Sequence, residues 1–244
     1  GIETRFVDSS DLAAIEAAKA RGVGVTIATG RMYRAAAFFG RIIKANVPLI
    51  CCNGGLVRSM KQERPVFVRH VDRTAVRELL QLCRDRNWYA QWYIGDEIYA
   101  ESYKPEYFAS YRTVQDFSVK EVGDDFLSYT DNVIQCVIRD KEGKIDNVVA
   151  ELRKRFSKTI FPQQNTGYSV DLTPPGINKA VGLAALMKRL GITVDEVMAC
   201  GDADNDLEML RFAGTSVVPV NGQPEAKALA SYIAPDNDED GIGR

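Results

Sequence analysis

The sequence lacks the features that mark several large classes of protein. Its 244 residues contain no apolar run long enough to cross a bilayer, no internal repeat and no visible signal peptide. With 31 basic and 33 acidic residues the net charge is −2, which gives no reason to expect nucleic acid or an acidic membrane surface as a partner. Five cysteines, an odd number with Cys51 and Cys52 adjacent, are not the pattern of a disulfide framework. We therefore expect a cytoplasmic globular protein.

The sequence contains only one histidine, His70, which lies in a charged stretch. We expect it to be exposed rather than catalytic. Cys51, Cys52 and Cys200 lie in apolar strands and are expected in the core, and no cysteine has the spacing of a metal ligand. The remaining composition, 45% hydrophobic and 26% charged, is that of an ordinary globular protein. No feature specifies an oligomeric state.

Helices and short apolar strands alternate at both ends of the chain. Asp8, with Asp11 three residues on, predicts the capped start of a helix that ends at Gly22. The predicted elements that follow it are a strand over 23–28, a helix over 32–45 and a strand over 49–52. In the C-terminal part they are a helix from Lys179 to 190, a buried strand over 197–200, a helix over 207–212, a strand over 216–220 and a helix from Pro224 to about 230. This rhythm is typical of a parallel α/β sheet.

The middle of the chain has a different character, because most of the aromatic residues gather there. We predict a hairpin over 89–99 around Gly95-Asp96, a half-exposed strand over 132–139, a helix over 145–156 and strands over 159–161 and 168–172. The fold class is therefore α/β with an inserted α+β unit. We predict a core domain over residues 1–56 and 172–244 and a cap domain over 57–171, with the site between them.

An acidic segment, GDADND at Gly201–Asp206, follows the predicted strand over 197–200. Open α/β sheets bind ligands at the carboxyl ends of their strands. Adjacent like charges repel one another unless a cation offsets them, and hard oxygen ligands favour Mg²⁺. By itself this segment is equally typical of an acidic helix start followed by a solvated turn.

Two further segments decide between these readings. Thr29-Gly30 offers a hydroxyl and backbone N–H groups for phosphate oxygens, and Lys179 offers a compact positive charge. With metal-binding carboxylates, these are the parts that phosphoryl transfer requires. Arg31 is as typical of a surface as of a cleft, and Asn53 is expected to shape the loop at its strand end.

Five motifs in this order resemble the haloacid dehalogenase superfamily, in particular its Cof-type sugar-phosphatase-like branch with a large cap. They are ATGR at Ala28–Arg31, CNGG at Cys52–Gly55, GINKAVGLAAL at Gly176–Leu186, GDADNDLEML at Gly201–Leu210 and NDEDG at Asn237–Gly241. The resemblance covers nearly the whole chain. It implies a Rossmann-like core, a mobile cap and a small phosphorylated metabolite as substrate.

The resemblance also implies roles for single residues. Thr29, with help from Gly30, corresponds to the residue that binds the phosphoryl group, and Lys179 to the lysine of the third motif. Asp202 corresponds to the Mg²⁺ ligand and Asn205 to a phosphate contact. Asp206 is implied to support the metal site and its water.

One departure from the family pattern affects the mechanism. The nucleophile of the family lies in an N-terminal DxDGT motif, and these 244 residues contain none. Asp8 aligns with the residue that caps the first core helix, so it is not a replacement. We expect the motif to lie upstream and the protein to be an Mg²⁺-dependent phosphatase that works through an aspartyl-phosphate. The alternatives are a phosphotransferase or mutase on the same scaffold, or a catalytically inactive binding protein.

Overall fold

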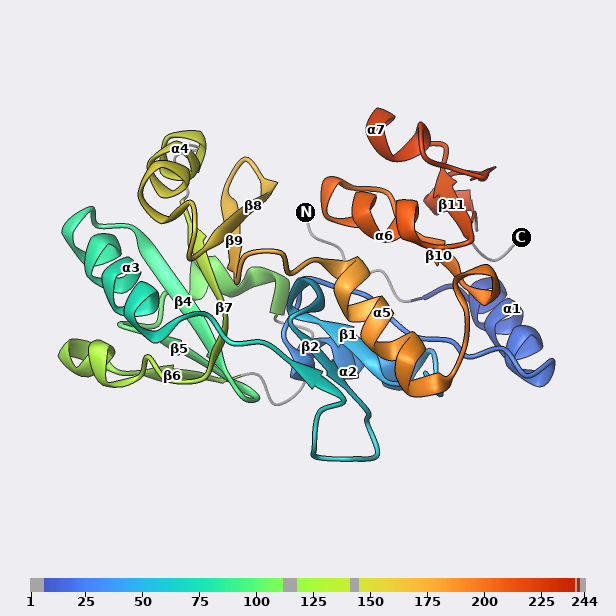
Figure 1. The fold of residues 1–244 in the computed structure, drawn as a ribbon, viewed down its shortest axis with the longest axis horizontal. Helices are drawn as coiled ribbons and strands as arrows, with labels where there is room; N and C mark the ends of the chain where they lie inside the picture. The colour runs from blue at the N-terminus through green and yellow to red at the C-terminus, as the bar shows by residue number, and fades with distance from the viewer. Residues whose placement is uncertain (1–6, 112–117, 141–144, 240, 242–244) are drawn as a thin grey trace.

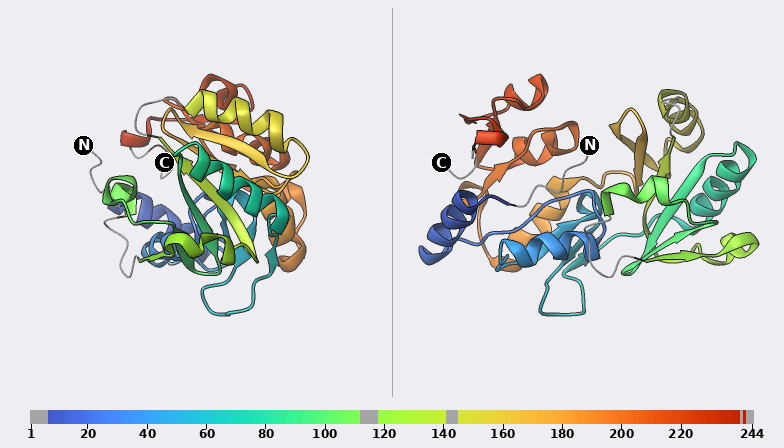
Figure 2. Two further views of the ribbon diagram at one scale, coloured as in Figure 1. Left: turned by 90° about the vertical axis from the view of Figure 1, so that its left-hand side faces the viewer. Right: turned by 180° about the vertical axis from the view of Figure 1, so that it is seen from behind.

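The protein is an elongated molecule with a different sheet arrangement at each end (Figures 1 and 2). The computed structural model describes residues 7–111, 118–140, 145–239 and 241. One half holds a six-stranded sheet, and the other holds two three-stranded sheets. Across the described ranges, no helix has both the length and the apolarity to cross a membrane.

The N-terminal part contributes the sheet β1-β2-β3, formed by Leu49–Cys51, Leu56–Arg58 and Phe67–Val68, with the helices α1 (Ser9–Ala20) and α2 (Tyr33–Ile42). The predicted regular strand over 23–28 is wrong, because this extended segment makes one parallel bridge, between Ala28 and Ile50. β1 is only three residues long, so it offers partners only to the end of the segment. Asp8 occupies the N-cap position of α1 as predicted, but its side chain makes no capping hydrogen bond.

The C-terminal part forms the parallel sheet β10-β11-β12. Its elements are α5 (Lys179–Leu190), β10 (Met198–Cys200), α6 (Leu207–Phe212), β11 (Thr215–Pro219), α7 (Pro224–Lys227) and β12 (Tyr232–Ala234). The start of α5 at Lys179 is confirmed, and so is its end at Gly191, which takes a left-handed φ of 71°. The expectation that β10 is wholly buried is wrong, since Met198 is 65% exposed while Ala199 is buried.

The six-stranded sheet has the order β6-β5-β4-β7-β9-β8. Its strands in chain order are β4 (Tyr89–Ile94), β5 (Glu97–Ala100), β6 (Val119–Glu121), β7 (Val133–Arg139), β8 (Phe161–Thr166) and β9 (Ser169–Thr173), and its helices are α3 (Arg73–Asp85) and α4 (Ile145–Phe156). The predicted hairpin is confirmed as β4 and β5, and the predicted helix over 145–156 is α4. The strand predicted over 159–161 is wrong, because β8 begins at Phe161.

The two faces of this sheet differ in polarity. Trp92, Cys136, Ile138, Val170 and Leu172 share a cluster with residues of α3 and α4, so this face is an apolar core. On the opposite face the side chains of alternate residues are largely polar. These residues are Gln91, Tyr93, Gln135, Arg139, Ser169, Asp171 and Thr173.

The polar face of the sheet lies against the other half of the molecule. Tyr93 and Val137 pack with Met32 and Ala36 in one buried cluster that contains residues of both halves. β7 is therefore buried from Val133 through Ile138, and the expectation of a half-exposed strand is wrong. The domain boundaries at 56/57 and 171/172 stay predictions.

Candidate active site

Asn53 connects three segments that are far apart in the sequence. It follows β1 with a left-handed φ of 50° and is completely buried. Its Nδ2 donates to Asp171 Oδ2 at 2.7 Å, and its Oδ1 accepts a hydrogen bond from Asn205 Nδ2 at 3.1 Å. Its backbone N–H donates to the carbonyl of Thr29 at 3.1 Å. One amide side chain thus joins the acidic turn to the six-stranded sheet, and its backbone holds the Thr29 loop beside them.

A second contact fixes the Thr29-Gly30 loop against the six-stranded sheet. Gln135 donates from Nε2 to the carbonyl of Gly30 at 3.2 Å. A Cβ at Gly30 would lie 3.0 Å from both Asn53 Oδ1 and Asp171 Oδ2. A side chain at this position would therefore force its neighbours apart, which explains why the sequence has glycine there.

Lys179 and Asp206 form a buried ion pair. Their Nζ–Oδ1 distance is 2.6 Å, and each side chain is only 7% exposed. The other carboxylate oxygen, Oδ2, accepts hydrogen bonds from the backbone N–H groups of Asp202 (3.1 Å) and Ala203 (3.2 Å). Asp206 therefore fixes the shape of the acidic turn, while Lys179 compensates its charge.

The start of α5 is packed closely against the Asn53 loop. A Cβ at Gly54, whose φ is +93°, would lie 2.0 Å from the backbone oxygen of Asn178. A Cβ at Gly182 would lie 2.9 Å from the Cα of Gly54. Two glycines thus let α5 approach the loop, and Lys179 is brought beside it.

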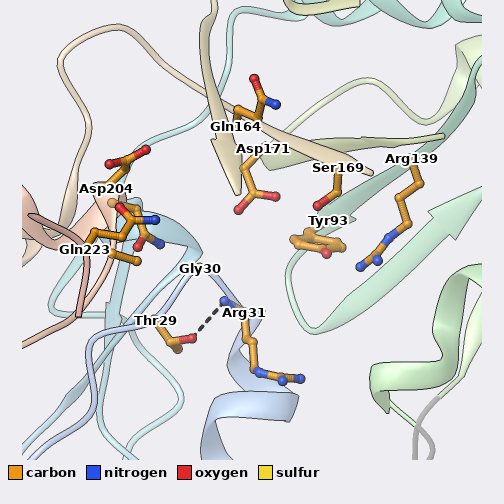
Figure 3. Close-up of a pocket in the computed structure, with 12 residues that line it drawn as sticks. Thr29, Gly30, Arg31, Tyr93, Arg139, Gln164, Ser169, Asp171, Asp204 and Gln223 are labelled. Carbon is orange, nitrogen blue, oxygen red and sulfur yellow. Dashed lines mark hydrogen bonds between the residues drawn. The ribbon is translucent and has the colours of Figure 1, made fainter. Parts of the chain in front are cut away.

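A cavity of about 260 Å³ opens between the two halves (Figure 3). The lining residues are Thr29, Gly30, Arg31, Tyr93, Arg139, Gln164, Ser169, Asp171, Ala203, Asp204, Asn205 and Gln223. Of the predicted site residues, Thr29, Gly30, Arg31 and Asn205 line it. Asn53, Lys179, Asp202 and Asp206 are absent from this lining, although Asn53 bonds directly to three of its members and Asp206 to the backbone of a fourth.

The hydroxyl of Thr29 accepts a hydrogen bond from the backbone N–H of Arg31 at 3.1 Å, and this bond closes the loop on itself (Figure 3). The Arg31 guanidinium lies 5.5 Å from the ring centre of Phe39, which supports the side chain at the edge of the cavity.

The sequence analysis missed the residues that the six-stranded sheet contributes. Tyr93, Arg139, Ser169 and Asp171 lie on its polar face, and all four line the cavity. A signal for Asp171 was present, because it is the single charged residue of the strand Ser169–Thr173, where it stands between Val170 and Leu172. That signal shows that the position is unusual, but it does not show which distant segment the carboxylate meets.

The acidic turn offers two carboxylates that could take part in a metal site. Asp202 and Asp204 are both exposed, and neither carboxylate has a hydrogen-bond or ion-pair partner within the described part of the chain. Hard oxygens of this kind suit Mg²⁺, which is commonly held by one or two carboxylates together with water and substrate oxygens. Among the residues that the structure describes, no three histidine, cysteine or acidic side chains cluster to hold an ion by themselves.

The thiol next to Asn53 is not available as a nucleophile. Cys52 is fully buried, and burial raises the pKa of its thiol well above the ordinary value. The thiolate is the reactive form of cysteine, so this side chain is inert at neutral pH.

The chain is similar to proteins of known family. A family model described as haloacid dehalogenase-like hydrolase matches residues 3–244. A 5-amino-6-(5-phospho-D-ribitylamino)uracil phosphatase of Bacillus subtilis (strain 168), YitU, is 26% identical over 99% of this chain and 90% of its own length. The crystal structure of a haloacid dehalogenase-like hydrolase from Bacteroides thetaiotaomicron is 27% identical, has a TM-score of 0.88 and is matched over 99% of this chain and 92% of that one. A HAD subclass IIB sugar phosphatase shares the fold, with a TM-score of 0.85 at 23% identity over 100% and 92% of the two chains.

Proposed function

This chain belongs to the haloacid dehalogenase-like hydrolase family, and on that premise we propose that it is an Mg²⁺-dependent phosphatase of small phosphorylated metabolites. One observation carries the proposal. Hydrogen bonds connect the Thr29 loop, Asn53 and Asn205 beside a polar cavity, and Asp206, the next residue in the chain after Asn205, forms the buried ion pair with Lys179. A phosphoryl group held there would have hydroxyl, amide and backbone donors arranged around it.

Each residue of the network has a role in this proposal. The Thr29 hydroxyl and the N–H group of Gly30 bind the phosphoryl oxygens, and Asn205 adds an amide donor at the opposite side. Lys179 supplies positive charge close to the group being transferred. Asp206 acts as a positioning residue, because both of its oxygens are engaged by Lys179 and by the backbone of the acidic turn.

Asp202 and Asp204 are the described residues best placed to hold Mg²⁺, since their carboxylates are exposed at the acidic turn. When bound, the ion would offset the negative charge between a carboxylate nucleophile and the phosphate. Asp206 supports this site from behind by fixing the backbone of residues 202 and 203.

The nucleophile of the proposed reaction is an aspartate of a DxDGT motif upstream of these 244 residues. Its carboxylate attacks phosphorus, the bond to the alcohol oxygen breaks, and the alcohol leaves with a proton from the second aspartate of that motif. The second aspartate then takes a proton from water as the water attacks the aspartyl-phosphate, so that inorganic phosphate is released and both aspartates return to their starting forms.

The substrate class follows from the cavity and from the relatives. The cavity is smaller than the 300–1,000 Å³ usual for drug-sized ligands, and its lining is mostly polar. The B. subtilis relative is named for a phosphorylated ribityl compound, and a structural neighbour is named a sugar phosphatase. We propose a phosphorylated polyol or sugar that is similar in size to that ribityl compound.

We also propose that the protein works in the reducing cytoplasm, which is supported by five cysteines that are all free.

The test uses the full-length protein and an aryl phosphate, followed by a panel of phosphorylated sugars, nucleotides, flavin and pyridoxal phosphates. We expect phosphate release that stops with EDTA and returns with Mg²⁺. Lys179→Ala and Asp202→Ala should each lower kcat at least 100-fold. Lys188→Ala, an exposed lysine on the same helix α5, is the matched control and should keep parent activity.

Three results would overturn the proposal. Near-parent turnover in either site variant would show that the network does not hold the reacting group. Saturable binding of phosphate esters with no turnover by a protein that has a DxDGT motif would favour a binding protein instead. Transfer of the phosphoryl group to a sugar, without release of inorganic phosphate, would indicate a phosphotransferase or mutase.

A further inference from the structure

Arg139 places a positive charge on the wall of the cavity that the six-stranded sheet provides. It is the last residue of β7, and it lines the cavity together with Tyr93 of β4 (Figure 3). Its Nε is buried, and within the described residues that atom has no hydrogen-bond partner. Burying such a donor without a partner is costly, so the side chain is held at the cavity wall with part of its hydrogen-bonding capacity unused.

The acidic side chains of the cavity do not neutralise this arginine. Of the two carboxylates that line it, Asp171 accepts a hydrogen bond from Asn53, and Asp204 lies on the acidic turn of the other half. None of the salt bridges between described residues involves Arg139. Its neighbours across the sheet are Tyr89 on β4 and Ser169 on β9, and both are uncharged at neutral pH. The guanidinium therefore keeps a full positive charge in a partly enclosed place.

Arg139 lies across the cavity from the proposed phosphoryl site. Thr29, Asp204 and Gln223 lie on one side of the cavity, and Arg139 and Ser169 lie on the other (Figure 3). A substrate with its phosphate at the Thr29 loop would extend its other end toward Arg139. A planar guanidinium is the group best suited to bind a carboxylate or a phosphate with two parallel hydrogen bonds.

We propose that Arg139 selects phosphate monoesters that carry a second anionic group at the end remote from the reacting phosphate. This inference rests on the proposed function and narrows its substrate class. The chemistry is that of a phosphorylated sugar acid or of a sugar bisphosphate, with hydroxyl groups between the two anions. Ser169 lies next to Arg139 in the sheet register and is placed to bind one of those hydroxyls.

The experiment compares three esters of one carbon skeleton on the full-length protein with Mg²⁺. Glucose 6-phosphate has no second anion, 6-phosphogluconate has a carboxylate and glucose 1,6-bisphosphate has a second phosphate. We expect kcat/KM to be at least 10-fold higher for one of the two esters with a second anionic group than for glucose 6-phosphate. Arg139→Gln should reduce that ratio by about 10- to 100-fold, the range for losing hydrogen bonds to a charged group.

Two further variants show whether the effect belongs to the guanidinium. Arg139→Lys keeps the charge and loses the planar fork, so it should keep part of the preference. Arg153→Gln removes an exposed arginine from α4, outside the cavity lining, and should leave the ratio unchanged. A preference for the carboxylate or for the second phosphate identifies which anion Arg139 binds.

The outcomes separate this inference from the proposed function. If the esters are hydrolysed but the ratio is near one, or is unchanged by Arg139→Gln, the inference is wrong and the phosphatase stands. If Arg139→Gln lowers all three kcat/KM values equally, the arginine contacts the transferred phosphate, and the inference is again wrong. If no ester is hydrolysed, the proposed function fails. Calorimetric binding of the same three esters to parent and Arg139→Gln protein then decides the inference by the ratio of Kd values.

Discussion

Removing one partner of the Lys179–Asp206 pair should destabilise the protein more than removing both. Each side chain is only 7% exposed, and the two are 2.6 Å apart. In Lys179→Met the Asp206 carboxylate stays buried without its cation, although it keeps two backbone hydrogen bonds. Breaking a buried pair costs about 3–5 kcal/mol, and those remaining bonds place this variant near 3 kcal/mol.

The opposite single variant, Asp206→Asn, leaves the Lys179 ammonium group without its carboxylate partner. In Asp206→Asn the amide oxygen can still accept the two backbone hydrogen bonds, but the amide nitrogen then faces the ammonium group as a second donor. We expect a loss of about 4 kcal/mol. The double variant Lys179→Met/Asp206→Asn contains no buried charge at this point and keeps the backbone contacts. It should lose only about 2 kcal/mol, whereas independent effects would add to about 7 kcal/mol.

Equilibrium unfolding in urea, followed by far-UV circular dichroism, measures these differences. With a slope of about 3 kcal/mol per M for a chain of this size, Lys179→Met should lower the midpoint by about 1 M. The double variant should unfold at a higher urea concentration than either single variant, yet remain inactive. Additive losses, or a single-variant shift below about 0.2 M, would refute the view that a buried, mutually compensating pair holds the acidic turn.

Three other predictions follow from the packing of the site. Gly54→Ala should lower the free energy of unfolding by roughly 3 kcal/mol or more, because its Cβ would lie 2.0 Å from the backbone oxygen of Asn178 at the start of α5. Gly191→Ala, also at a positive φ but in open space, should lower it by only about 1 kcal/mol, and urea midpoints compare the two variants. Asn53→Asp would set a second carboxylate against Asp171, so it should lower the urea midpoint by at least 1 M and enlarge the radius of gyration measured by X-ray scattering. An unchanged radius would mean that this contact does not hold the two halves together. At pH 8 only Cys200, the one cysteine that is not fully buried, should react with a thiol reagent within minutes. Fast reaction of several thiols in the native protein would contradict the burial that raises their pKa values.

Much of the site could be predicted from local sequence, because a few neighbouring residues determine where strands end and helices begin. Lys179 begins α5 after Asn178, whose side chain accepts the Val181 N–H, and Gly191 ends it. Glycine and cap residues determine such boundaries through a few neighbouring bonds. Asp8 takes the predicted N-cap position without the side-chain hydrogen bond, and the regular strand over 23–28 was wrong, because position in the chain does not guarantee a hydrogen bond or a partner strand.

The residues of the six-stranded sheet could not be assigned in the same way. The alternation of polar and apolar residues in β7 is equally typical of a strand with one face in water, and only the structure places that face against the other half. The partner of Asp171 is Asn53, 118 residues away, and nothing local specifies that pair.

The sequence by itself determined the α/β and α+β rhythm, the acidic turn, the Thr29-Gly30 loop and the position of Lys179, because each depends on propensities and hydrogen bonds within a few residues. The tertiary structure decided which groups meet. It placed Asp206 on Lys179 rather than in the cavity, made Asn53 the link between the two halves, and set Arg139 opposite Thr29. The last two relations depend on how the polar face of the six-stranded sheet packs on the loops of the other half. That packing is fixed by contacts between residues more than a hundred positions apart, such as Gly30 with Gln135 and Asn53 with Asp171, whereas the Lys179–Asp206 pair spans 27 positions.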